Sequence, residues 1–130
     1  GKFSEDARSK LDALIQVKNH LIDRLGPGVS LGELYAEVVE ISKELGIYDE
    51  FMGEGEDKVV FIGHGVGLEL DELPIFYPKG PQLESGNVLA CEPKVIVPGE
   101  EVLGIEDTYA ITATGNTVLS KAPNIFEIGP

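Results

Sequence analysis

The chain has 130 residues, of which 42% are hydrophobic and 25% are charged, and its formal net charge is −13. This length fits a single domain over residues 1–130. Because so acidic a chain repels phosphate backbones, we expect no nucleic-acid partner. No apolar run reaches the ~18 residues of a membrane span, so no membrane partner is expected. The single cysteine, Cys91, cannot form an internal disulfide, which favours a reducing, cytoplasmic location.

The first predicted element is an amphipathic helix from Ser4 to about Leu25. Apolar residues recur here at three- and four-residue steps, and Gly26 and Pro27 end the pattern. Ser4 is placed to act as the N-cap. One face of this helix should therefore be covered by another layer of the fold.

A second helix is predicted to begin at Leu31. Ser30 and Glu33 form a capping box in front of it, and Gly46 has the position of the residue that ends it. Two helices joined by a short turn, each with one apolar face, need a sheet or each other as a covering layer.

The rest of the chain is predicted to be mainly β-structure. We expect a short buried strand over residues 58–62 and an antiparallel hairpin of strands 88–97 and 102–113, with its turn at 98–101. A third strand is expected over residues 117–119. Helices first and an antiparallel hairpin afterwards predict an α+β fold, in which two amphipathic helices pack on an antiparallel sheet.

The segment 61–73 places His64 among three alternating glycines, followed by an acidic cluster. Glycine at every second position lets another group approach the backbone closely. Taken alone, the segment also fits a glycine-rich strand with one exposed histidine.

Glu92 and Glu106 form a second candidate feature. If the hairpin turns near Gly99, antiparallel partners have position numbers that add up to about 198, so the two glutamates face each other. Facing carboxylates repel, which calls for a shared proton, a basic side chain such as Lys94, or a metal ion between them. Two carboxylates together with the nitrogen of His64 suit Mn²⁺, Co²⁺, Fe²⁺ or Zn²⁺.

His64 in GHGVGLELDELP, Glu92 in ACEPK and Glu106 in GIEDT together resemble the carboxy-terminal half of the catalytic domain of the pita-bread metallopeptidases. This family includes proline dipeptidase, aminopeptidase P, methionine aminopeptidase and creatinase. The resemblance spans nearly the whole chain, is closest to an Xaa-Pro dipeptidase and implies half of a pita-bread fold. It also implies that His64, Glu92 and Glu106 are metal ligands, that Glu92 is the catalytic proton shuttle, and that the complete site holds two divalent ions.

Two differences from the family pattern change these expectations. Asp71 stands seven residues after His64, where the family has a second histidine that contacts substrate. We therefore expect Asp71 to act in the catalytic site with His64 and Glu92, and to shift substrate preference or weaken transition-state stabilisation. Two further aspartate ligands of the family precede its first helix and are not seen before the helix here. We therefore expect at most one divalent ion in this chain, and a fragment or truncated homologue with little or no activity alone.

Three functions stay open at this point. The leading one is a metallopeptidase that hydrolyses a peptide bond next to proline, with an Xaa-Pro peptide as its substrate. The alternatives are a non-catalytic peptide- or protein-binding module of the same fold and a creatinase-like, metal-independent hydrolase. Because an exposed sheet edge pairs readily with other chains, we also expect a homodimer or association with the missing amino-terminal half.

Overall fold

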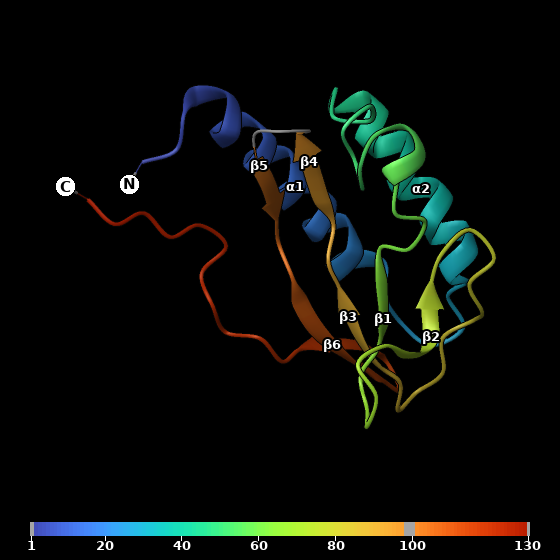
Figure 1. The fold of residues 1–130 in the computed structure, drawn as a ribbon. Coiled ribbons are helices and arrows are strands. Elements are labelled where there is room, and N and C mark those ends of the chain that lie inside the picture. Colours follow the sequence, from blue (N-terminus) through green and yellow to red (C-terminus); the bar gives the residue numbers. More distant parts are fainter. Residues whose placement is uncertain (1, 98–100, 130) are drawn as a thin grey trace.

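The computed structural model describes residues 2–97 and 101–129, and it begins with the two expected helices. These are α1 (Glu5–Arg24) and α2 (Leu31–Glu44) (Figure 1). Both predicted N-caps are confirmed, because the hydroxyls of Ser4 and Ser30 each accept a hydrogen bond from the backbone N–H three residues ahead. Gly46 follows α2 with a φ of 72°, a conformation that glycine adopts without strain.

Short antiparallel strands follow the helices. Five of them form one sheet in the order β2-β1-β3-β6-β7, and β4 and β5 pair with each other. Their bounds are β1 (Gly63–Gly65), β2 (Glu72–Phe76), β3 (Val88–Cys91), β4 (Lys94–Val97), β5 (Glu101–Gly104), β6 (Asp107–Thr112) and β7 (Gly115–Val118), and a 3₁₀ turn (Gly55–Asp57) precedes them.

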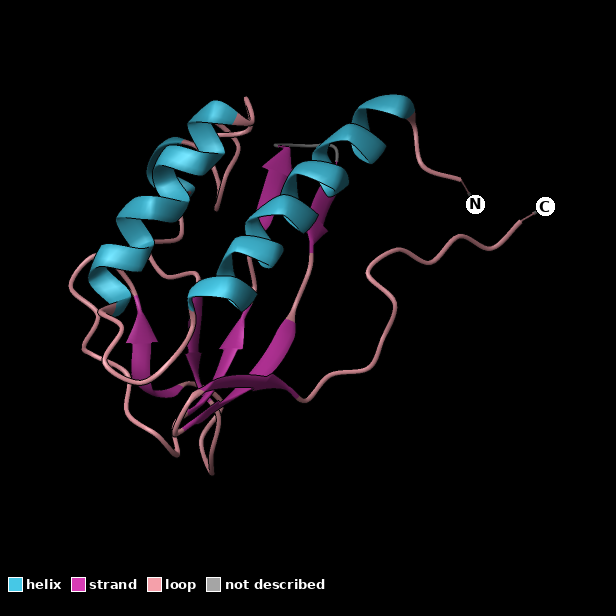
Figure 2. Cartoon of the chain, turned by 180° about the vertical axis from the view of Figure 1, so that it is seen from behind, coloured by secondary structure: helices cyan, strands magenta, loops and turns pink. Residues whose placement is uncertain are grey.

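Both helices cover the same face of the sheet; they lie behind it in Figure 1 and in front of it in Figure 2. Alternate residues of β3 and β6, among them Leu89, Cys91 and Tyr109, are buried in one cluster with the apolar faces of the helices. The helical members of this cluster include Leu11, Leu14, Val17, Leu21, Leu31, Leu34 and Val38. The predicted fold class, two amphipathic helices on an antiparallel sheet, is therefore confirmed.

The prediction of a strand over residues 58–62 is wrong. This segment is irregular, and the side chain of Val60 is exposed. Ile62 bonds to both neighbouring segments, since its N–H donates to the carbonyl of Phe76 and its carbonyl accepts from the N–H of Glu92, at 2.8 and 2.7 Å. The regular strand begins only at Gly63, where the chains come so close that an added Cβ would lie 2.2 Å from a neighbouring carbonyl oxygen.

The predicted hairpin has the expected register but is not continuous. Paired positions add up to 198 in β3–β6 and again in β4–β5, yet both ladders stop around residues 92–93 and 105–106. Pro93 has no N–H to donate, so it interrupts the strand that contains it. Residues 98–100 of the predicted turn lie outside the described residues, and the third strand spans Gly115–Val118 instead of 117–119.

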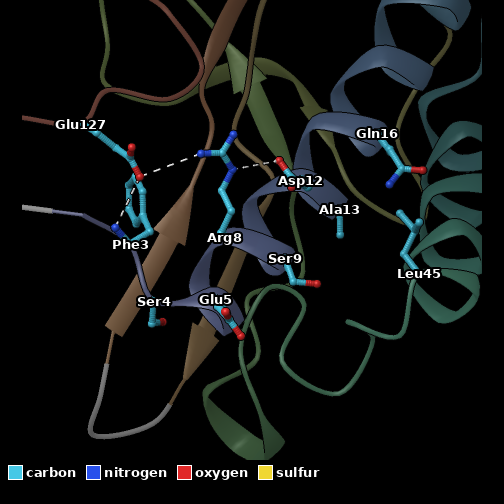
Figure 3. A pocket seen from close by; sticks show the side chains of 10 residues that line it. All are labelled: Phe3, Ser4, Glu5, Arg8, Ser9, Asp12, Ala13, Gln16, Leu45 and Glu127. Carbon is cyan, nitrogen blue, oxygen red and sulfur yellow. Dashed lines mark hydrogen bonds and ion pairs between the residues drawn. The ribbon is translucent and has the colours of Figure 1, made fainter.

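The carboxy-terminal segment, residues 119–129, runs along the outside without regular structure and ends near the amino terminus (Figures 1 and 2). Arg8 of α1 lies between Asp12 and Glu127, at 3.4 and 3.9 Å, and Glu127 also accepts a hydrogen bond from the N–H of Phe3 (Figure 3). These contacts tie the tail to α1. No helix in the described part of the chain is long and apolar enough to cross a membrane.

Candidate functional site

Two predicted site residues, His64 and Glu92, lie on the sheet face that points away from the helices. His64 pairs with Ala90 across β1 and β3, so the two side chains point to the same face. The pleat alternates, and Glu92, two residues further on, continues this face, whereas Leu89 and Cys91 are buried on the helix side. The site therefore borders the sheet and stays open to groups that approach from outside the core.

The ring of His64 is oriented by its own strand. Its Nδ1 lies 2.9 Å from the carbonyl oxygen of Gly65, and because a carbonyl can only accept, Nδ1 carries the proton of this hydrogen bond. The other ring nitrogen, Nε2, lies 3.5 Å from Oδ1 of Asp71 and 3.8 Å from Oε1 of Glu92. A proton or a cation placed between these three atoms would be attracted by both carboxylates.

The second oxygen of Glu92 is engaged by Lys94. The ammonium of Lys94 donates a hydrogen bond of 2.8 Å to Oε2, and the side chains of the pair are only 22% and 24% exposed. Of the positive groups expected beside the carboxylates, the basic side chain of Lys94 is in contact with Glu92.

Glu106 lines a pocket of about 240 Å³ together with Glu92 and Lys94, and the other lining residues are Val102, Gly104 and Ile105. The side chain of Glu106 is exposed. Among the side chains that the structure describes, which leave out those of residues 57 and 101, no three of His, Cys, Asp or Glu are grouped closely enough to hold a metal ion. As they lie, the three predicted ligands do not form a complete metal site, and their assignment stays a prediction.

The loop that carries Asp71 is held by Glu72, the first residue of β2. Its Oε1 accepts hydrogen bonds from the backbone N–H groups of Leu68 and Glu69, at 2.5 and 2.7 Å. A Cβ at Gly67 would lie 1.9 Å from the same carboxylate. Glu72 and Gly67 therefore shape the loop that brings Asp71 to His64.

Asp107 anchors the segment next to Glu106. It is buried and forms an ion pair with Lys18 of α1, which links the start of β6 to the helix layer. Cys91 pairs with Asp107 across the ladder of β3 and β6. Burial raises the pKa of the Cys91 thiol, and the carboxylates of Asp107 and Glu92 raise it further. The thiol therefore stays protonated, as expected for a cysteine that serves core packing.

Sequence reasoning missed a second charged cluster, which joins the two helices. Glu37 of α2 lies 2.8 Å from the Nε2 of His20 and receives two hydrogen bonds, of 2.9 and 2.8 Å, from Arg24. The pKa of Glu37 is lowered to about 2, mainly because of these hydrogen bonds from Arg24. The available signal was the spacing of His20 and Arg24, which puts both on one face of α1.

Comparison with solved structures shows the class of this fold. The prolidase from Pyrococcus furiosus superimposes with a TM-score of 0.83 at 31% identity, covering 95% of this chain and 35% of that chain. An X-Pro aminopeptidase from Thermotoga maritima has a TM-score of 0.85 at 21% identity, covering 96% and 34%, and this likeness is one of fold alone. The pita-bread fold expected from the sequence is confirmed.

The chain belongs to metallopeptidase family M24, whose model matches residues 1–113. Among curated relatives, the Xaa-Pro dipeptidase of Pyrococcus furiosus is 32% identical over 122 residues, and that of Pyrococcus horikoshii is 29% identical over the same length. Each match covers 93% of this chain and 33% of the relative. The chain thus spans about a third of the length of these relatives.

Proposed function

We propose that this chain contributes one wall of the active site of an Xaa-Pro-type peptidase, which hydrolyses a peptide bond next to proline. The observation that carries the proposal is the meeting of His64 with Asp71 and Glu92 on the open face of the sheet. Membership of a metallopeptidase family and the named Xaa-Pro dipeptidase relatives support this reaction class.

In this proposal Glu92 is the proton shuttle. Its carboxylate lies beside His64 on the open face of the sheet, and a carboxylate so placed can take a proton from attacking water and return it to the leaving amine. Asp71 is half exposed beside it. An anion at the rim favours substrates that carry a positive charge, such as a free amino terminus.

We also propose that this chain holds at most one divalent ion, of manganese, cobalt, zinc or iron. His64 and Glu92 are its nearest pair of ligands, and Glu106 is the third. Because Glu106 lies in the neighbouring pocket and Lys94 bonds to Glu92, binding of an ion requires these side chains to move. The cytoplasmic location stays a prediction from the single cysteine.

A non-catalytic peptide- or protein-binding module is the second candidate. The specific observation in its favour is the ion pair of Glu92 with Lys94, which already neutralises the carboxylate that catalysis would use. In such a module the same open face would hold a peptide without cleaving it.

The test is hydrolysis of Xaa-Pro dipeptides by the protein that carries this chain, with Mn²⁺ and with a chelator. Glu92→Gln should lower kcat by about 100-fold or more, since a proton shuttle contributes 10²–10⁴-fold. Glu40→Gln, on the exposed face of α2, is the matched control and should leave kcat unchanged.

Two results would contradict the peptidase proposal. Binding of an Xaa-Pro peptide without turnover would identify the binding module. Turnover that resists the chelator would instead indicate creatinase-like, metal-independent chemistry.

A further inference from the structure

We propose that Lys94 is an internal cation that competes with a divalent metal ion for the carboxylate of Glu92, and that it thereby controls whether the metal site forms. This inference rests on the proposed function, because it concerns the same site. It starts from the disagreement between the family's metal chemistry and the residues that surround Glu92 in this structure.

The first support is the quality of the Lys94–Glu92 contact. Its 2.8 Å length is that of a charge-assisted hydrogen bond, and more than three quarters of each side chain is shielded from solvent. Because shielded charges are screened little by salt, the ammonium affects every other cation that approaches this carboxylate.

The second support is the space around Lys94. Lys94 is the first residue of β4 and pairs with Gly104 of β5, where the absence of a side chain leaves the pocket of about 240 Å³ open. A Cβ at Gly104 would lie 3.4 Å from the Cβ of Lys94. The side chain of Lys94 thus has room both to bond to Glu92 and to turn away within the pocket, where Glu106 is a second carboxylate.

The third support is electrostatic. An ammonium and a divalent ion repel each other strongly at a separation of a few ångströms, so they cannot share Glu92 at full strength. A metal ion must displace Lys94 before it can use both oxygens of Glu92. Removing the ammonium should therefore raise metal affinity, whereas substitutions elsewhere that change the charge equally should not.

The experiment is calorimetric titration of the 130-residue chain with Mn²⁺. Lys94→Met should lower the Kd for Mn²⁺ by on the order of ten-fold or more, because the competing charge is gone. Lys43→Met is the matched control, since Lys43 pairs with Glu40 at 2.6 Å on α2 and its loss also frees a glutamate. This control should bind Mn²⁺ as the unchanged chain does.

The double variant Lys94→Met with Glu92→Gln shows whether the gain passes through Glu92, and it should lose the gain. If circular dichroism shows that Lys94→Met folds poorly, Lys94→Gln, which keeps a polar side chain, provides a second measurement of Mn²⁺ affinity without the ammonium. Equal affinities in the unchanged chain and both Lys94 variants, no detectable binding in any of them, or a gain that persists in the double variant would each overturn the inference.

The titration and the peptidase assay fail separately. If Lys94→Met binds Mn²⁺ more tightly while the protein cleaves no Xaa-Pro dipeptide, the proposed function fails and the role of Lys94 stands. If the protein is an active peptidase but Lys94 has no influence on Mn²⁺ affinity, the role of Lys94 fails alone.

Discussion

The two glycines that flank His64 sit against the backbone of the neighbouring strands. A Cβ added at Gly63 would lie 2.2 Å from the carbonyl oxygen of Ala90, and one at Gly65 would lie 2.2 Å from that of Leu73. These glycines therefore serve first to let β1 fit between β2 and β3. Because these glycines have no side chains, they also let another group come close to His64.

Gly65→Ala should lower the free energy of unfolding by about 1–3 kcal/mol, because the added methyl group overlaps backbone that cannot move without breaking the ladder. Urea denaturation measures this change. Gly26→Ala is the matched control, since its nearest neighbour would be 3.6 Å away. Equal stability of the two variants would show that β1 is not packed as described.

At the scale of the elements, the cluster of His20, Arg24 and Glu37 fixes α1 against α2. Since the pKa of Glu37 falls to about 2 in the folded state from an ordinary value of 4.5, its ionised form is stabilised by folding. This contribution is complete above pH 4.5 and is lost as the pH falls towards 2.

Acidification should therefore lower the urea midpoint of the unchanged chain more steeply than that of Glu37→Gln. The difference between the two should be largest above pH 4.5 and should vanish as the pH falls through about 2. Because the Glu37 side chain is 35% exposed, added salt should reduce it. Glu44→Gln on the same helix serves as the control. Parallel pH curves for the unchanged chain and Glu37→Gln would contradict this account.

The helices were predictable to within a residue because their signals are local. Ser4 and Ser30 cap them, and the apolar positions repeat at helical spacing. The irregular course of residues 58–62 was not predictable in this way. Lys58 and Val59 bond back to the preceding loop, whereas Ile62 bonds to segments distant in sequence. The interruption of the hairpin had one local signal, Pro93, whose missing N–H removes a donor.

The candidate site was predictable only in part. Strand register predicted that Glu92 faces Glu106, and these two residues lie between the β3–β6 and β4–β5 ladders and line one pocket. His64 was expected to join Glu92 as a ligand, and its Nε2 lies 3.8 Å from Oε1 of Glu92. The approach of Asp71 to His64 depends on the loop that Glu72 holds in place. No periodic pattern in the sequence predicts the shape of this loop. Lys94 was visible as a possible partner of the carboxylates, but only side-chain geometry shows that it reaches Glu92.

At the scale of the whole molecule, β2 and β7 form the edges of the five-stranded sheet. Next to β1 and β2, the loop residues Leu68 and Leu70 are 100% and 88% exposed. Unpaired edges and exposed apolar side chains both favour association. We therefore retain the prediction that this chain forms a homodimer or pairs with further segments of its own protein.

Sedimentation equilibrium at tens of micromolar should show self-association of the 130-residue chain. Replacing Leu68 and Leu70 by serine should weaken it without loss of stability, because neither side chain is packed in the core. Val60→Ser, at an exposed position in the irregular segment before β1, is the control. A monomer at every concentration would contradict the prediction.

The interruption between β3 and β4 and between β5 and β6 divides the hairpin into an inner ladder, β3–β6, and an outer ladder, β4–β5. Separate ladders can open with separate free energies, in local unfolding events that leave the rest of the fold intact. Lys94 belongs to the outer ladder of β4 and β5, whereas His64 belongs to the inner sheet. Val95 and Leu103 of this outer ladder are nevertheless buried in the common core cluster, so opening it would uncover part of the core. The ammonium of Lys94 can leave Glu92 at lower cost if its side chain turns within the pocket while the ladder stays closed.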